Sequence, residues 1–282
     1  MDLISHLTRL STLVRDGRAL TTPVPAPQYP PRAPNAPIVA LLSPHPDDEC
    51  IVGGLALRLG LESGWRVVNI AITQGSDPTR QLARGEELRN ACHYLGFECE
   101  NFGERGLTRV FQDARDRGGD VWQANVDALA EKLSRLRPAL LLAPHAHDGQ
   151  GTHIGTYWLM LDALAQLTKD YAPLIALTEY WSTMETPNLM VEISLSQLAH
   201  LVSGLLHHTG EIARNPYHAS LPLWMMEAVR RGSERVGRPG GTVVEYDFAT
   251  LYTLLRWRDG ALERAWSGGR FVSATDHPEM AL

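Results

Sequence analysis

Two apolar runs that contain no charged residue constrain this chain more than any other feature, because a dense polar cluster follows each of them. Residues 37–42 (PIVALL) lead into residues 43–49 (SPHPDDE), and residues 138–144 (PALLLAP) lead into the histidine-rich stretch 145–153. Uncharged runs of this length are typical of buried strands in a parallel sheet. Ligands of open α/β sheets bind beyond the carboxyl ends of such strands, so we expect both clusters at one functional edge.

Strand-like and helical segments alternate along the chain from residue 37. This alternation predicts a doubly wound α/β sheet, followed by a less regular C-terminal part that caps the site. The predicted strands are 37–43, 66–73, 97–102, 138–144, 173–180, 189–193 and, after a Gly/Pro turn at 237–241, 242–258. The predicted helices are 50–63, 81–95, 121–136, 154–168, 195–209 and 220–231.

The N-terminal segment differs from the rest in composition. Residues 1–20 have the apolar spacing of a short amphipathic helix, and the proline-rich stretch that follows is typical of an extended arm. We therefore divide the chain into a helix with an arm, 1–36, and a single catalytic domain, 37–282. The arm either wraps the body or reaches a neighbouring subunit of a homo-oligomer, and both interpretations stay open.

Composition narrows the classes of partner. The 26 Lys and Arg against 32 Asp and Glu leave a net charge of −6, which argues against a nucleic-acid binder. No apolar stretch is long enough to span a membrane, and no targeting segment stands out. The three cysteines lack the spacing of a disulfide framework or a Cys-rich zinc site, so a reducing cytoplasm is the expected compartment.

The two clusters contain the residue types of a catalytic metal centre. A catalytic zinc usually has three protein ligands and an open position, and His45, Asp48 and one histidine of the second cluster would supply that set. Asp47 would then act as general base, and Glu49 would face the helix start or hold His45 in one tautomer. The competing interpretation is an acidic turn that complements a helix dipole.

At these residues the chain resembles the PIG-L/LmbE-like family of N-acetylglucosaminyl deacetylases and related amidases. The resemblance rests on Pro44-His-Pro-Asp-Asp-Glu49, with Thr73-Gln-Gly75 and Arg84-Gly-Glu-Glu-Leu88 as secondary similarities, and it covers about residues 37–180. It implies a Rossmann-like three-layer fold with a mostly parallel sheet, a divalent metal (zinc, or another divalent ion) and removal of an acyl group from an amide nitrogen. It also implies His45, Asp48 and His153 as metal ligands and Asp47 as general base.

The second block departs from the family pattern. Gln150 and Thr152 stand where the family commonly has the histidine that stabilises the oxyanion and the aspartate that orients it. Either Gln150 donates a hydrogen bond itself, or His145 or His147 takes the role, or this step is weakened. Loss of one oxyanion donor lowers the rate about 10²–10³-fold, so the expected activity depends on which of these alternatives holds.

Substrate contacts are assigned by the same resemblance to Arg84 and Glu104, each of which could equally be a solvated charge. His218 is a further candidate for lining the site, whereas His207 and His208 are expected in surface or packing roles. The expected substrate is a small acylated amine, such as an N-acetylated amino sugar or a glycoconjugate. The alternatives are an amidase of a thiol conjugate or lipidated glycoside, and a catalytically weakened metal- or sugar-binding scaffold.

Overall fold

A single sheet organises the chain, and its first half is parallel as the sequence predicts. The computed structural model describes residues 2–237, 240 and 244–282, and within these residues nine strands form the sheet in the order β3-β2-β1-β4-β5-β7-β6-β9, with β8 paired to β7. The first five strands run parallel to one another. They are β1 (Ile38–Ser43), β2 (Arg66–Ala71), β3 (Glu98–Asn101), β4 (Leu140–Pro144) and β5 (Leu174–Thr178).

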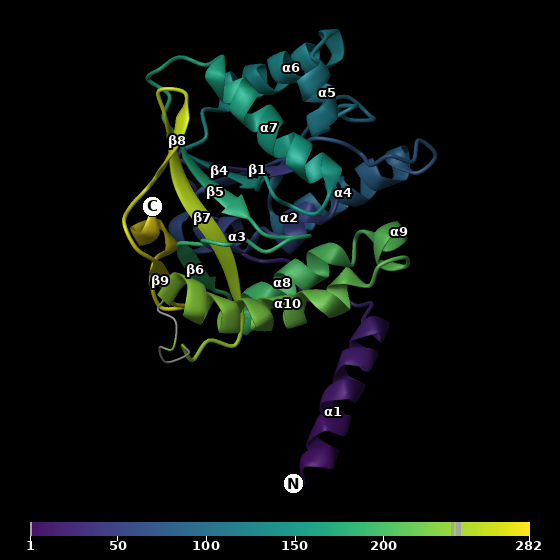
Figure 1. Ribbon diagram of the computed structural model, residues 1–282. Coiled ribbons are helices and arrows are strands. Elements are labelled where there is room, and N and C mark those ends of the chain that lie inside the picture. The colour runs from purple at the N-terminus through teal and green to yellow at the C-terminus, as the bar shows by residue number, and fades with distance from the viewer. Residues whose placement is uncertain (1, 238–239, 241–243) are drawn as a thin grey trace.

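Helices cover both faces of the sheet, which makes the three-layer α/β fold (Figure 1). Successive β1 side chains alternate between the two cores: Val39 and Leu41 pack in one, and Ala40 and Leu42 in the other. The first core is covered by α2 (Asp48–Ile51), α3 (Gly54–Ser63), α4 (Gln81–Leu95), α8 (Leu195–Leu205) and α10 (Tyr217–Gly232). The second is covered by α5 (Gln112–Arg117), α6 (Asp120–Leu136) and α7 (Gly151–Ala165).

The C-terminal part adds an antiparallel edge to the parallel sheet. The strand β7 (Ala249–Arg258) pairs antiparallel with both β5 and β6 (Leu189–Glu192), and β8 (Ala261–Arg264) and β9 (Arg270–Val272) extend this edge. The predicted strand 242–258 therefore begins only at residue 249, and the predicted turn at 237–241 lies largely outside the described residues. The chain between β6 and β7 forms α8, α9 (Thr209–Ile212) and α10, and these helices reach the carboxyl edge of the parallel strands.

Two predicted helices are interrupted. The segment 50–63 forms two helices, α2 and α3, because the chain turns at Val52-Gly53. The segment 195–209 ends as α8 at Leu205, before the short α9. In contrast, α4 spans residues 81–95 as predicted and ends at Gly96, whose φ of +69° favours glycine.

The proline-rich arm lies on the body of the chain rather than extending from it. Its Val24 is held from both sides, since its N–H donates to Ser203 Oγ at 3.0 Å and its carbonyl accepts from Tyr94 Oη at 3.0 Å. Farther along, Tyr29 donates to the Leu95 carbonyl and Arg32 to the Gly96 carbonyl. The helix before it, α1 (Leu3–Asp16), contains no buried residue and projects from the body (Figure 1).

Candidate metal centre and catalytic pocket

The polar cluster after β1 lies at the point where the order of the parallel strands reverses. The strand β1 has β2 on one side and β4 on the other, so its following loop opens beside the loop after β4. Ligand sites of open α/β sheets form at such switch points. The loop is fixed by β2, because Thr73 Oγ1 donates to the Pro44 carbonyl at 2.7 Å and in turn accepts from the Gly75 N–H.

Asp47 is held in an unusual backbone conformation within this loop. Its φ of +112° lies in the left-handed region, which costs a non-glycine residue about 1–3 kcal/mol. Its N–H donates to Glu49 Oε2 at 3.0 Å, and its side chain is buried beside Arg84, whose Nη2 lies 3.7 Å from Asp47 Oδ2. The turn thus directs the carboxylate of Asp47 and that of Asp48 to the same edge of the sheet.

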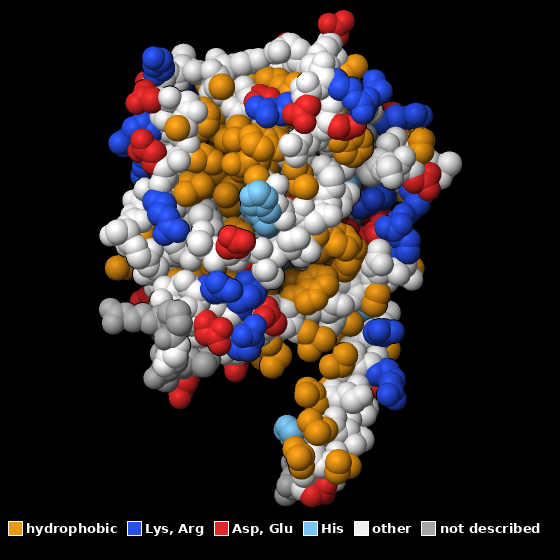
Figure 2. All heavy atoms as spheres, viewed as in Figure 1, with side chains coloured by type: hydrophobic (Ala, Val, Ile, Leu, Met, Phe, Trp, Pro, Cys, Tyr) orange, Lys and Arg blue, Asp and Glu red, His pale blue; other side chains and the backbone are white. Residues whose placement is uncertain are grey.

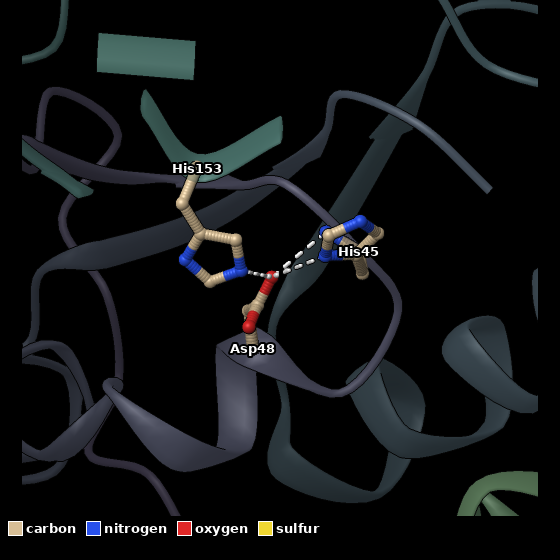
Figure 3. A group of neighbouring side chains, drawn as sticks. All are labelled: His45, Asp48 and His153. Atoms are coloured by element: carbon tan, nitrogen blue, oxygen red, sulfur yellow. Dashed lines mark hydrogen bonds and ion pairs between the residues drawn. The ribbon is translucent and has the colours of Figure 1, made fainter. Parts of the chain in front are cut away.

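Three side chains from the two clusters converge at this edge, as Figure 3 shows. His45, Asp48 and His153 each offer a ligand atom, and these atoms lie within 4.8 Å of one another. The carboxylate oxygen Asp48 Oδ2 lies 3.7 Å from His45 Nδ1 and 3.6 Å from His153 Nε2. These are the three residues that the family resemblance implies as metal ligands.

His153 is oriented by the start of α7. Gln150 is the N-cap residue, and its side-chain oxygen accepts the N–H groups of Thr152 and His153. On the far side of the ring, Asp148 Oδ2 lies 3.5 Å from His153 Nδ1. A carboxylate behind a ligating imidazole fixes its tautomer in many metal sites. Sequence reasoning did not assign this role to Asp148, although the Asp148–His153 spacing contains the signal.

The chemistry of the three side chains fits a divalent metal ion. Among the described residues, His153 Nε2 is buried and lacks a hydrogen-bonding partner, although it faces Asp48 Oδ2 across 3.6 Å. Buried polar atoms are normally satisfied, so this unpartnered nitrogen beside a carboxylate indicates a missing ligand. Two imidazoles and one carboxylate are also a common set for a catalytic zinc, which keeps its fourth position for water.

The local charges shift the pKa values of the neighbouring carboxyl groups Asp47 and Asp48 in opposite directions. Burial and the adjacent Asp48 carboxylate raise the pKa of Asp47 well above its usual range, against the opposing effect of Arg84. Burial also disfavours the charged form of Asp48, but His153 and His45 outweigh it and lower the pKa of that carboxyl. Burial opposes protonation of His153, yet the Asp48 and Asp148 carboxylates raise the pKa of its imidazole. Environments that separate the pKa values of adjacent groups are typical of catalytic sites.

A pocket that His45 and Asp47 line has two walls. The first, which we call the catalytic wall, comes from the segment before residue 165 and consists of His45, Asp47, Gly75, Ser76, Arg84 and Gln150. Gly75 has a φ of +87°, which favours glycine, and an added Cβ would meet Arg84 Nη1 at 2.5 Å. The second, which we call the C-terminal wall, consists of Tyr180, Trp181, Glu211, Arg214 and Tyr217.

Arginines gather around one carboxylate where the two walls meet. Glu211 Oε1 lies 2.6 Å from Arg214, and Glu211 Oε2 lies 3.0 Å from Arg80 and 3.8 Å from Arg84. Burial opposes its ionisation, but these arginines lower the pKa of Glu211 to about 2. Arg84 also donates to the Pro46 carbonyl at 2.8 Å, so it joins the first cluster to the C-terminal wall.

The structure separates the candidates for the oxyanion role. Because the Gln150 oxygen is used by the helix cap, its NH₂ group must point the other way, and Nε2 lies 3.5 Å from His45 Nε2. His145 is buried, with Nε2 3.1 Å from the Ser182 carbonyl and Nδ1 accepting the His147 N–H, while the His147 side chain is exposed. Of the three residues, Gln150 lines the pocket.

Of the two expectations for Glu49, the contact with the helix start is met, because its Oε2 accepts the N–H of Asp47, the N-cap residue of α2. The expectation that Glu49 holds His45 is wrong, since its Oε1 lies 2.6 Å from Nε2 of the buried His208. His218 does not line the pocket but faces the N-terminal segment, where its Nε2 lies 3.3 Å from the Arg18 carbonyl. The contacts with His208 and Arg18 join segments far apart in the chain, so no local pattern could have predicted them. Glu104 is exposed in the turn after β3, and its substrate role stays a prediction.

The fold and this cluster define a Rossmann-like α/β protein with a candidate metal centre at the switch point of its sheet. Residues 40–164 match the sequence family PIG-L, described as GlcNAc-PI de-N-acetylase. This match agrees with the resemblance to the PIG-L/LmbE-like family that the sequence motifs indicated. Among curated proteins, none matches the sequence.

Solved structures of known proteins share the fold at low sequence identity. A conserved protein of Thermus thermophilus, TT1542, is 18% identical with a TM-score of 0.56, and the match covers 77% of this chain and 93% of the other. The hydratase GalB of Pseudomonas putida KT2440, which acts on 4-carboxy-2-hydroxymuconate, is 17% identical with a TM-score of 0.57 (77% and 95% covered). The N,N'-diacetylchitobiose deacetylase of Pyrococcus horikoshii is 16% identical with a TM-score of 0.56 (90% and 93% covered). Since a hydratase and a deacetylase share this fold, the reaction must be argued from the site.

Within the part of the chain that the structure describes, no helix combines the length and apolar character that a membrane crossing requires.

Proposed function

We propose that this protein is a metal-dependent hydrolase that removes an acyl group from an amide nitrogen of a small molecule. The observation that carries the proposal is the set of partly buried His45 and buried Asp48 and His153, with buried Asp47 beside it. The PIG-L match and the deacetylase among the similar structures support an N-acetylated amino sugar or glycoconjugate as the substrate class.

His45, Asp48 and His153 would hold the metal, for which we propose zinc. Such an ion, when bound, lowers the pKa of a water molecule and polarises a carbonyl group. Asp148 would keep the ring of His153 in the ligating orientation. The metal identity is therefore a specific part of the proposal that metal analysis can test.

The catalytic wall supplies the proton transfers. Asp47 would accept a proton from water as the water oxygen adds to the amide carbonyl carbon, and would return it to the nitrogen as the C–N bond breaks. A carboxylate whose pKa is raised is a stronger base, which suits this role. The NH₂ group of Gln150 would donate a hydrogen bond to the developing oxyanion, and Arg84 would hold Asp47 and contact the substrate.

The experiment that tests this function is metal analysis combined with an assay of amine release. We expect the purified protein to bind about one zinc per chain and to release amine from at least one of a panel of N-acetylated sugars. Asp48→Ala should lose both the metal and the activity. A protein that binds metal but releases no amine from any acylated substrate would instead be a binding scaffold.

Two results would contradict the metal centre itself. One is a wild-type protein that takes up no divalent ion when zinc, manganese or cobalt is supplied. The other is unchanged metal content in Asp48→Ala, which would place the ion elsewhere. Asp170→Ala is a matched control, because this exposed carboxylate pairs with the half-exposed Arg137 and precedes β5, at the edge of the sheet opposite the site.

A further inference from the structure

A second cavity adjoins the catalytic pocket, between β5, β7 and α10. It opens to solvent and has a volume of about 180 Å³. We call it the apolar pocket, because hydrophobic side chains, many of them buried, form more than half of its wall. They include Ile51, Leu221, Met225, Ala228, Leu251 and Tyr252.

The apolar pocket shares residues with the site on two sides. Tyr180 lines both the apolar pocket and the catalytic pocket. Val52 and Thr178 line both the apolar pocket and the small cavity beneath Asp48 and His153. The ring of Tyr180 also lies 5.4 Å from that of His153. The apolar pocket therefore begins within one side chain of the candidate metal centre.

The charged groups on its wall are already paired with each other. Arg231 donates to both oxygens of Glu179, at 2.7 and 2.6 Å, and to Glu227 at 3.0 Å. Glu179 also accepts the Met184 N–H. An anionic or cationic ligand would have to break these contacts, whereas an apolar group would leave them intact.

Aromatic side chains surround the boundary between the two pockets. The ring of Tyr180 lies 4.9 Å from that of Trp181 and 5.9 Å from that of Trp224. Both tryptophans keep large exposed fractions, 51% and 41%. On the face shown in Figure 2, hydrophobic side chains gather over α8 and α10 as well as along α1. Exposed tryptophans at a pocket mouth are suited to covering an alkyl chain or stacking on a ring.

We infer that the apolar pocket holds an alkyl or aryl substituent of the substrate while the scissile amide lies at the candidate metal centre. The preferred substrate class would then be amides that carry an apolar group of several carbons near the amide, on either the acyl or the amine side. This inference rests on the proposed function and narrows its substrate class.

The test is a pair of homologous series. One series lengthens the acyl group from N-acetyl- through N-butanoyl- to N-hexanoylglucosamine. The other keeps the N-acetyl group and lengthens the glycoside from methyl through butyl to hexyl. Each buried methylene should raise kcat/KM about three- to fourfold. The end members should therefore differ by about 100-fold in the acyl series, which adds four methylenes, and by several hundredfold in the glycoside series, which adds five. The series that shows the rise identifies the side of the amide that enters the apolar pocket.

Two variants on α10 show whether the apolar pocket causes the rise. Ala228→Phe would fill the cavity and should abolish the dependence on chain length. Leu223→Phe places the same ring on the same helix at a position that is 37% exposed and should keep the dependence. Because Ala228 is buried and the variant could fold poorly, Trp224→Ala serves as a second variant. It should reduce the dependence at least threefold.

The outcomes separate this inference from the proposed function. Hydrolysis of N-acetyl substrates with no dependence on chain length in either series, or an equal dependence in Ala228→Phe and Leu223→Phe, would overturn the apolar pocket alone. If nothing is hydrolysed, the proposed function fails, and calorimetry then compares binding of the hexyl with the methyl glycoside and of N-hexanoyl- with N-acetylglucosamine. Tighter binding of the longer member of either pair that Ala228→Phe abolishes would support the apolar pocket, and equal binding within both pairs would reject it.

Discussion

The two walls of the pocket differ in how they are built. The catalytic wall is made of loops and helix starts that follow β1, β2 and β4, and its polar groups hold one another in fixed positions. The C-terminal wall comes from the segment after β5 and from α9 and α10, and it combines aromatic rings with an arginine cluster. We interpret the first as the chemical half of the site and the second as the half that selects the substrate.

The largest effect that this division predicts is the loss of turnover in Asp47→Asn. Removal of a general base should lower kcat about 10²–10⁴-fold, while KM changes little and the metal stays bound. Steady-state kinetics together with metal analysis would measure both quantities. If the variant keeps more than a tenth of the wild-type activity, Asp47 is not the general base. The interpretation of the catalytic wall as the chemical half of the site would then lose its main support.

Gln150→Glu isolates the second group of the catalytic wall. The substitution keeps an oxygen to cap α7 and removes the NH₂ donor, so kcat should fall about 10²–10³-fold while the melting temperature stays close to that of the wild type. Gln150→Ala is the companion variant, since it should also lose about 1 kcal/mol of stability with the cap. Equal turnover in Gln150→Glu and the wild type would exclude the oxyanion role.

On the C-terminal wall, Glu211→Gln should affect stability in a pH-dependent way. The folded pKa of Glu211 is depressed to about 2 from an unfolded value near 4.5, so its stabilising effect is complete above pH 4.5 and is lost as the pH falls toward 2. The difference in unfolding free energy between wild type and variant should shrink by about 2–3 kcal/mol over that window.

Urea denaturation at several pH values would measure this difference. Glu227→Gln is the matched control, because its side chain is 46% exposed and surface ion pairs contribute little. A difference that stays constant from pH 7 to pH 2.5 would show that the arginine cluster does not stabilise the charged form of Glu211.

The smallest effect is expected for Trp181→Ala. Loss of an exposed ring on the selecting wall should raise KM up to about tenfold at nearly constant kcat, since such contacts bind substrate and transition state alike. Phe271→Ala is the control, because it removes another partly exposed ring, on β9. A drop in kcat with unchanged KM would contradict this expectation. It would show that the C-terminal wall also contributes to the chemical step.

The sequence predicts the catalytic wall much better than the C-terminal wall. The family resemblance selects His153 among the histidines of the second cluster. The parallel strands, α4 and the meeting of the two polar clusters follow from local signals: uncharged runs, helical spacing and polar residues directly after strands. Each of these signals lies close in the chain to the feature that it predicts.

The remaining features depend on contacts between distant segments. The Glu49–His208 pair joins residues 159 apart, and the antiparallel pairing of β7 joins the C-terminal part to β5. Likewise, the position of the arm depends on Val24 meeting Ser203. Nothing in the local composition of either partner specifies such pairings, and even the buried His208 has the same sequence context as a surface histidine.

The backbone conformation of Asp47 lowers the stability of the fold at a residue that the proposed activity needs. Glycine or asparagine would adopt a φ of +112° at lower energetic cost than aspartate. Replacements that relax the turn and stabilise the folded state would therefore also remove the carboxylate that we propose as the base. A selection for thermal resistance alone should therefore yield inactive proteins altered at position 47. A selection for activity alone should leave the strained turn in place and raise stability elsewhere.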